Sequence, residues 1–157
     1  MRITLLVVGK TQNGPFVQGI EEYGKRLGHY IKFNIETIPE LKNTKSLSME
    51  QQKEKEADLL LGSFQPGDHI VLLDEHGKLR RSVEFAEWLQ KQMSTGIKRL
   101  VFVVGGPYGF SPRVYAAAAE KISLSPMTFS HQMIRLVFTE QLYRAFTIIN
   151  HEPYHHE

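Results

Sequence analysis

The sequence contains no cysteine in its 157 residues. This absence excludes a thiol nucleophile, a disulfide framework, an iron–sulfur cluster and a cysteine-based zinc site. It also fits a reducing compartment. Histidines are present, but no predicted helix carries a carboxylate and a histidine at the i, i+4 spacing of a metal-binding pair. We therefore expect no metal site.

The sequence also lacks a strong charge of one sign and a long apolar run. The 19 basic and 17 acidic residues give a net charge of +2, far from the basic composition of most nucleic-acid binders. No run approaches the roughly 20 apolar residues of a membrane span. The run before Gly9 is too short for the apolar part of a signal peptide with its cleavage site. We expect a soluble, cytoplasmic protein with no membrane partner.

The residues that are present have the composition and pattern of one globular domain. With 41% hydrophobic residues, a chain of this length can bury about two thirds of its unfolded surface without a disulfide or a metal. Runs rich in Ile, Leu and Val alternate with amphipathic stripes. The pattern indicates an α/β fold, a mostly parallel sheet flanked by helices, as a single domain over residues 1–157. Strands are predicted at 2–8, 32–38, 69–73, 100–104 and 121–124, and helices at 15–28, 48–62, 82–96, 111–119 and 131–149.

Three predicted loops follow strands, at the edge of the sheet where open α/β folds bind ligands. They are residues 74–78, 105–110 and 125–130. The glycines of 105–110 let a ligand approach the backbone, but the segment matches neither GxGxxG nor GxxxxGK[ST], and a plain tight turn is the alternative. Segment 124–129 is too apolar for a solvated loop. It can wrap an apolar or aromatic ligand, or Met127 and Phe129 can fill the core.

Two features of the helices have structural interpretations. The charged run Glu50–Asp58 is read as the solvated face of its helix, rather than as an interaction tail. Trp88 lies on the inward stripe of the helix predicted to begin with Ser82 as its cap, and we expect it in the core.

The last predicted helix is apolar around more of its circumference than one core-facing stripe requires. We therefore expect it to bury a second surface against another subunit. Arg135 is interpreted as a free cation that can contact a phosphate or a carboxylate. Glu140 and Arg144 have the spacing of a surface or interface ion pair.

The tail after that helix offers groups for stacking, hydrogen bonding and proton transfer: Tyr154, His155 and His156. An expression tag is the alternative explanation for the histidines. It is disfavoured, because only two of them are adjacent and Glu157 follows.

Six short motifs stand in order along the chain. They are Val7-Val8-Gly9-Lys10, Leu72-Leu73-Asp74 with Gly77-Lys78, Gly105-Gly106-Pro107-Tyr108-Gly109, Leu124-Ser125-Pro126-Met127-Thr128-Phe129 followed by His131, Glu140-Gln141-Leu142-Tyr143-Arg144-Ala145, and Pro153-Tyr154-His155. Together they resemble the RlmH family, formerly called YbeA-like, of SPOUT-class methyltransferases that modify large-subunit ribosomal RNA. The resemblance covers the whole chain.

The resemblance implies a SPOUT fold with a C-terminal trefoil knot, a homodimer whose knotted regions pack together, and S-adenosyl-L-methionine (AdoMet) as methyl donor. It implies no metal. It also implies that the knot loops bind AdoMet in a bent form. The contacts carried over by position are Leu73, Gly105, Leu124, Ser125, Pro126, Met127, Thr128 and Phe129.

The implied reaction is methylation of N3 of a pseudouridine in 23S rRNA on the assembled 70S ribosome. The candidates for binding or deprotonating the target base are Tyr154, His155 and His156, with Arg135 and Arg144 as charge-stabilising alternatives. One departure concerns the tail, since members of the family end in Tyr-His-Arg or Tyr-His-Lys and this chain has His156 in place of the permanent cation.

Two other functions remain open from the sequence. One is a non-catalytic knotted module that binds the ribosome without transferring a methyl group. The other is an enzyme acting on free nucleotides, which would show no dependence on the ribosome.

Overall fold

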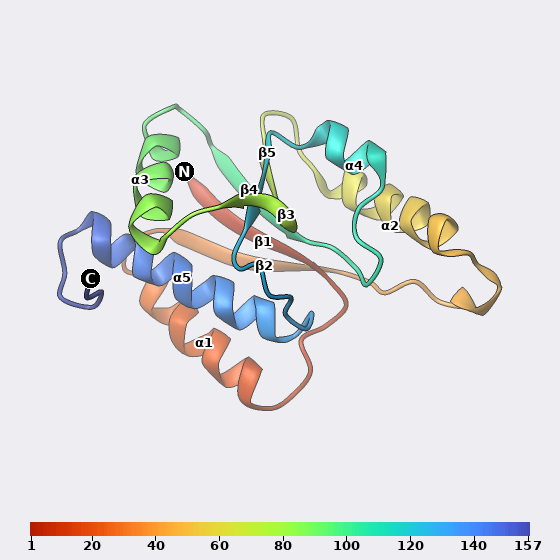
Figure 1. The fold of residues 1–157 in the computed structure, drawn as a ribbon, viewed down its shortest axis with the longest axis horizontal. Helices are drawn as coiled ribbons and strands as arrows, with labels where there is room; N and C mark the ends of the chain where they lie inside the picture. Colours follow the sequence, from red (N-terminus) through yellow and green to blue (C-terminus); the bar gives the residue numbers. More distant parts are fainter.

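A five-stranded parallel sheet forms the centre of the molecule, in the computed structural model of residues 1–157 (Figure 1). The strand order is β2-β1-β4-β3-β5, and every neighbouring pair is parallel. The strands are β1 (Arg2–Val8), β2 (Lys32–Ile38), β3 (His69–Leu79), β4 (Arg99–Val104) and β5 (Glu120–Ser123). The expected α/β class is confirmed.

Helices cover both faces of the sheet (Figure 1). They are α1 (Pro15–Leu27), α2 (Met49–Ser63), α3 (Ser82–Met93), α4 (Pro112–Ala117) and α5 (Met133–Ile149), with a short 3₁₀ helix at Thr44–Ser46. One apolar cluster joins the sheet to α1, α3 and α5, and a smaller one joins it to α2 and α4. All six residues of β4 are buried, and residues 100–104 form the continuous apolar run that is typical of a central parallel strand. Trp88 is buried in the larger cluster.

The helix starts follow capping chemistry, with one correction. The predicted capping box of α2 is present, because the Gln51 N–H donates to the Ser48 hydroxyl and the Ser48 N–H donates to the Gln51 side chain. Ser82, however, is the first residue of α3 rather than its cap. The Arg81 N–H donates to the Glu84 carboxylate at 2.8 Å, whereas the Ser82 hydroxyl donates to Gln141 of α5.

Strand β3 is longer than predicted, and this changes the first of the three predicted loops. Its regular pairing with β5 is interrupted by a bulge between Leu73 and Lys78 and then resumes. Residues 74–78 are thus a bulged part of the strand. At Gly77 a Cβ atom would lie 2.7 Å from backbone atoms of Ile122, so only glycine allows the two strands this approach.

Helix α4 and strand β5 also differ from their predicted bounds. α4 ends at Ala117 rather than 119, because Ala118 is extended and the Ala119 N–H already pairs with the carbonyl of Ile70 on β3. β5 therefore begins at Glu120, and Leu124 lies outside it, in the segment that follows.

Helix α5 lies on the sheet between α1 and α3 (Figure 1). Its buried apolar residues are Phe138, Leu142, Ala145 and Phe146. Leu136 packs against Gly19 of α1, and Gln141 bonds Ser82 of α3. Two helices of the same chain therefore pack against the flanks of α5, and burial of a further surface against another subunit stays a prediction. The trefoil knot stays a prediction.

Candidate active site

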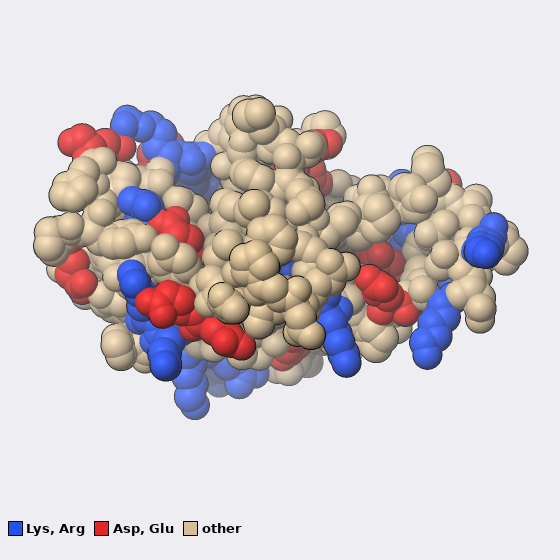
Figure 2. Space-filling view, turned by 90° about the horizontal axis from the view of Figure 1, so that it is seen from below, with Lys and Arg blue, Asp and Glu red and all other residues tan.

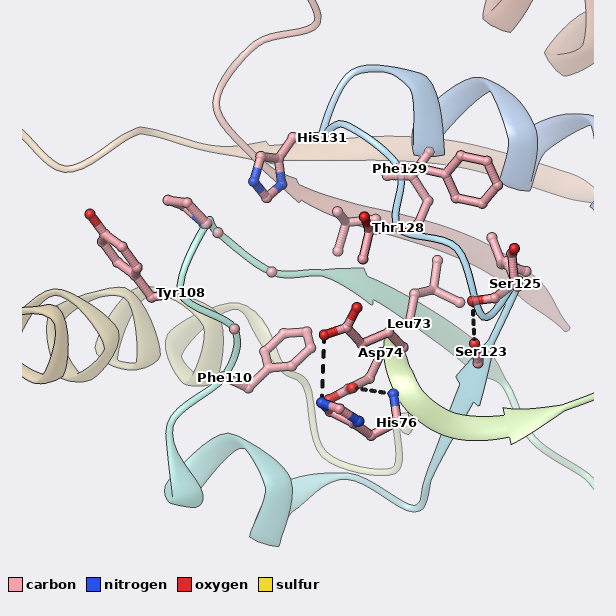
Figure 3. A pocket seen from close by; sticks show the side chains of 18 of the residues that line it. Leu73, Asp74, His76, Tyr108, Phe110, Ser123, Ser125, Thr128, Phe129 and His131 are labelled. Carbon is pink, nitrogen blue, oxygen red and sulfur yellow. Dashed lines mark hydrogen bonds and ion pairs between the residues drawn. The ribbon is translucent and has the colours of Figure 1, made fainter.

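A cavity of about 590 Å³ lies at the carboxyl ends of β4 and β5 and beside the bulged part of β3 (Figure 3). All three loops predicted to meet there contribute to its walls. Of the residues predicted to bind the methyl donor, it is lined by Leu73, Gly105, Leu124, Ser125, Met127, Thr128 and Phe129, whereas Pro126 does not line it. Figure 3 shows Thr128 and His131 on one side of the hollow and Asp74, His76 and Phe110 on the other.

The glycine loop, residues 105–110, connects β4 to α4 through a tight turn. The Gly109 N–H donates to the Gly106 carbonyl at 3.2 Å, and Gly109 has φ of +79°, a conformation that favours glycine. The ring of Phe110 packs under Gly105, where a Cβ atom would lie 2.9 Å from it. The loop is thus both a tight turn and a wall of the cavity.

The segment 124–129 forms the opposite wall and leaves its large apolar side chains accessible. Met127 is 76% exposed and Phe129 37% exposed. The Ser123 hydroxyl donates to the Ser125 carbonyl, and the Ser125 hydroxyl accepts from the Met127 N–H at 3.0 Å. The alternative in which Met127 and Phe129 fill the core is therefore wrong.

The bulged part of β3 supplies the acidic side of the cavity. One Asp74 oxygen accepts from the His76 N–H at 2.8 Å, and the other accepts from the Tyr115 hydroxyl. Burial, with the bond to Asp74, raises the pKa of Tyr115 to about 12. Tyr115 and Lys53 line the cavity from helices α4 and α2, and neither was predicted, because the cavity walls were expected to come from the three loops alone. The sequence did offer a signal for Tyr115, namely its place in the first turn of the helix that Ser111 caps, directly after the glycine loop.

Glu56 corrects the interpretation of the charged run on α2. Most of that run is accessible, but Glu56 is buried behind the glycine loop, and its carboxylate accepts from the Gly106 N–H at 2.8 Å. Burial raises the pKa of Glu56. Glu56 precedes Ala57 and lies four residues before Leu60, which are both buried, so helical spacing places it on the inward face of α2. The surrounding run of charged residues obscured this signal.

Arg135 is not the free cation that the sequence analysis describes. It is 1% exposed, and its guanidinium donates to the carbonyls of Val8 and Gly9 at 2.9 Å and to the Thr11 hydroxyl. Its Nε donates to the His131 carbonyl, so the donors of Arg135 are engaged by the end of β1, by the segment after it and by the preceding turn of the chain. Arg135 therefore joins the start of α5 to the end of β1, and this geometry does not support a catalytic role.

The tail folds back on the last turns of α5. Tyr154 donates to Glu140 at 3.2 Å, its ring stands edge-on to Tyr143, and the Arg144 guanidinium lies 4.7 Å from its centre. Arg144 pairs with Glu140 at 2.6 Å, as predicted, and contacts the His155 ring at 3.2 Å. Burial is the main cause that raises the pKa of Tyr154. The phenol is therefore held as a hydrogen-bond donor.

The C-terminal tail and the segment that leads into α5 lie at opposite ends of this helix (Figure 1). His131, just before the helix, lines the cavity, whereas Tyr154 lies beyond its last residue. Seventeen helical residues span about 25 Å. Within one chain, Tyr154, His155 and His156 are therefore not brought to the cavity.

The structure contains neither a cluster of metal ligands nor a helix that could cross a membrane. No three His, Asp or Glu side chains are grouped so that they could hold a metal ion. None of the helices has both the length and the apolar character needed to span a bilayer.

Comparison with known proteins identifies the family. Residues 1–155 match the family model described as "Predicted SPOUT methyltransferase". The chain is 64% identical over 157 residues to proteins named "Ribosomal RNA large subunit methyltransferase H" from Phocaeicola vulgatus and Parabacteroides distasonis, with 100% of both chains covered. A protein of that name from Christiangramia forsetii is 59% identical over 156 residues, which are 99% of each chain. The chain belongs to the RlmH family of SPOUT methyltransferases.

Proposed function

We propose that this protein transfers a methyl group from AdoMet to N3 of a pseudouridine in 23S rRNA, on the assembled ribosome and hence in the cytoplasm. The observation that carries the proposal is the cavity formed by the bulged part of β3 together with the loops that follow β4 and β5. The names of its full-length relatives support large-subunit rRNA as the substrate.

The residues around the cavity fit AdoMet. A volume of about 590 Å³ lies within the usual range for small-molecule sites. Leu73, Leu124 and Phe129 offer apolar surface for an adenine ring, and the glycine loop offers backbone groups. Asp74 and Glu75 bring negative charge to a ligand that carries a positive sulfonium and an ammonium group. When bound, AdoMet supplies an electrophilic methyl group.

The protein must align the acceptor with that methyl group, exclude water and remove a proton. An imide N3–H is a poor nucleophile until its proton leaves, so a proton acceptor is required at the base. Tyr154, with its raised pKa, suits donation of a hydrogen bond to the base rather than proton removal. His155 and His156 are the proposed proton acceptors, and His156 is the more exposed of the two.

A homodimer resolves the separation between cavity and tail. Since about 25 Å of helix divides them in one chain, the proposed residues can meet only if a second copy brings its tail to the cavity. A symmetric dimer would then contain two such sites. We propose that each active site combines the cavity of one subunit with Tyr154, His155 and His156 of its partner.

The charge distribution favours a structured substrate over free RNA. The net charge is +2, and Figure 2 shows Lys and Arg interspersed with Asp and Glu around a middle region without charges. Such a surface attracts phosphates weakly, so contacts of shape with an assembled particle must add to the affinity. We expect weak, salt-sensitive binding to naked 23S fragments.

Two measurements test the proposed function. Isothermal titration calorimetry should show AdoMet binding to the purified protein, and ribosomes from a strain lacking the gene should lack N3-methylpseudouridine. If the protein binds no AdoMet and the ribosomes of that strain keep the modification, the proposed function is wrong.

A further inference from the structure

Glu56 is the one buried carboxylate next to the wall of the cavity. It is 9% exposed, comes from the middle of α2, and does not itself line the cavity. Its only hydrogen bond runs from the Gly106 N–H to its Oε1 atom, at 2.8 Å. A buried charge is costly unless a specific bond compensates it. Packing alone therefore does not explain why a carboxylate is buried at this position.

The absence of a side chain at Gly106 leaves room for that carboxylate. A Cβ atom at Gly106 would overlap the Glu56 carboxylate, so any larger residue would displace it. That Cβ would point at α2, on the side of the loop where Glu56 lies. The contact thus links the side chain of Glu56 directly to the backbone of the glycine loop.

A second set of contacts with α2 holds the segment that follows the glycine loop. Arg113, at the start of α4, donates to the Glu54 carboxylate at 2.7 Å and to Asp58 at 2.9 Å, both on α2. The glycine loop is therefore held to α2 near its first residues by Glu56 and just after its last residues by Arg113. Arg113 and its partners are accessible, whereas the Glu56 bond is buried and less screened by solvent.

We propose that Glu56 is a positioning residue for methyl-donor binding, which it supports by holding Gly106 and the adjoining Gly105 in the conformation that the ligand contacts. This inference rests on the proposed function. Without the bond, the glycine loop samples other conformations. The apparent Kd for AdoMet then rises as the population of the conformation that binds AdoMet falls. The maximal rate is unchanged once AdoMet is bound, since Glu56 does not touch the reacting atoms.

The experiment compares Glu56→Ala, Glu56→Gln and the exposed neighbour Lys55→Ala. Loss of a bond to a charged group corresponds to about tenfold or more in affinity, so E56A should raise the Kd and the KM for AdoMet by about tenfold. Its kcat on ribosomes at saturating AdoMet should stay within about twofold of the wild type. E56Q keeps an amide oxygen for Gly106 and should restore most of the affinity, and K55A should match the wild type.

Gly106→Ala provides a second test that keeps Glu56 in the chain. The added methyl group displaces the carboxylate, so the single variant should raise the Kd for AdoMet as E56A does. In the double variant E56A/G106A the obstruction is gone, and the Kd should be no higher than in E56A alone. Additive effects of the two substitutions would overturn the proposal, as would unchanged affinity in E56A.

Hydrogen exchange gives a readout that does not depend on methyl transfer. The Gly106 amide should exchange faster in E56A than in the wild type and K55A, with E56Q close to the wild type. A purely structural role would instead lower the active fraction, which reduces kcat and leaves KM unchanged, and that result overturns the proposal. If the wild type binds no AdoMet, the proposed function and this inference both fail. If the wild type binds and E56A binds equally well, only the inference fails.

Discussion

Arg135 and Glu56 are buried charged side chains that each hold a loop near the cavity. Arg135 donates to the carbonyls of Val8 and Gly9, and Glu56 accepts from the Gly106 N–H. In both cases the bond satisfies a backbone group that would otherwise be unpaired in the interior. In each case a single side chain thereby holds in place a loop segment that has no hydrogen bonds of regular secondary structure to position it.

Replacing Arg135 by Met should destabilise the fold. The buried carbonyl of Gly9 and the partly buried carbonyl of Val8 lose their donor, so we expect the free energy of unfolding to fall by about 3 kcal/mol. Arg26→Met is the matched control, because Arg26 and its partner Glu22 are accessible and such pairs contribute about 0–1 kcal/mol. Urea unfolding of the three proteins measures the difference. Equal effects of the two substitutions would contradict the structural role of Arg135.

The buried carboxyl of Glu56 predicts a pH dependence of known sign. Burial raises its pKa above the ordinary value of 4.5, so folding makes protonation of this carboxyl easier than it is in the unfolded chain. Its stabilising contribution is present below the ordinary pKa and is lost as the pH rises through the raised value. Relative to Glu56→Gln, the wild type should therefore gain thermal stability as the pH falls from about 8 towards 4.5. A relative loss over that range would contradict the assignment.

At the scale of elements, β3 and β5 fit together only through the bulge that follows Leu73. The bulge aims Asp74 and its neighbours at the cavity, and Gly77 then allows the strand to approach the backbone of Ile122, which a Cβ atom would meet at 2.7 Å. The shape of the acidic wall thus depends on one crowded glycine.

Gly77→Ala should destabilise the protein, since the obstructing atoms belong to backbone that cannot turn aside. Overpacking of this kind costs about 1–3 kcal/mol, or about 2–10 °C in Tm for a chain of this size. Gly62→Ala is the control: it lies in α2 with open space around it, and it should raise stability by about 0.5–1 kcal/mol. Scanning calorimetry distinguishes the two. A neutral G77A would show that the strands can separate without cost.

Local patterns predicted the elements whose limits are set within their own sequence. The bounds of β1 and the capping box at Ser48 are examples. The bulge after Leu73 depends on β5, about 45 residues later in the chain, and the burial of Glu56 depends on the glycine loop 50 residues away. The three segments that line the cavity were predictable, because the carboxyl ends of parallel strands share one edge, although the first of them is a bulged part of β3 rather than a loop. The contacts that support these segments, such as the bond from the Gly106 N–H to Glu56, were not predictable, because they join residues 50 positions apart in the sequence.

At the scale of the whole molecule, one chain holds the two proposed halves of an active site at opposite ends of α5. The tail is held in place by Tyr30, which donates to Glu152 at 2.7 Å, and by Arg144. A tail ordered in this way suits presentation to another subunit. Because α1 and α3 pack against the flanks of α5, the proposed dimer could use only the remaining accessible residues of this helix.

Mixed dimers test this arrangement. One variant carries Gly105→Val, which obstructs the cavity, and the other carries alanine at positions 154, 155 and 156. Each homodimer should be inactive, whereas random mixing should restore about a quarter of the wild-type sites, since half of the dimers then contain one intact pair. Activity measured after exchange of subunits gives the result. No recovery in proven mixed dimers would contradict a site shared between subunits.

The most direct test of the central claim is methyl transfer from tritiated AdoMet to 70S ribosomes that lack the modification, compared with naked 23S rRNA. The wild type should label N3 of a pseudouridine on ribosomes and leave naked rRNA nearly unlabelled. Tyr154→Phe and His156→Ala should reduce the labelling of ribosomes without abolishing AdoMet binding. Absence of label on ribosomes, or equal label on naked rRNA, would contradict the account.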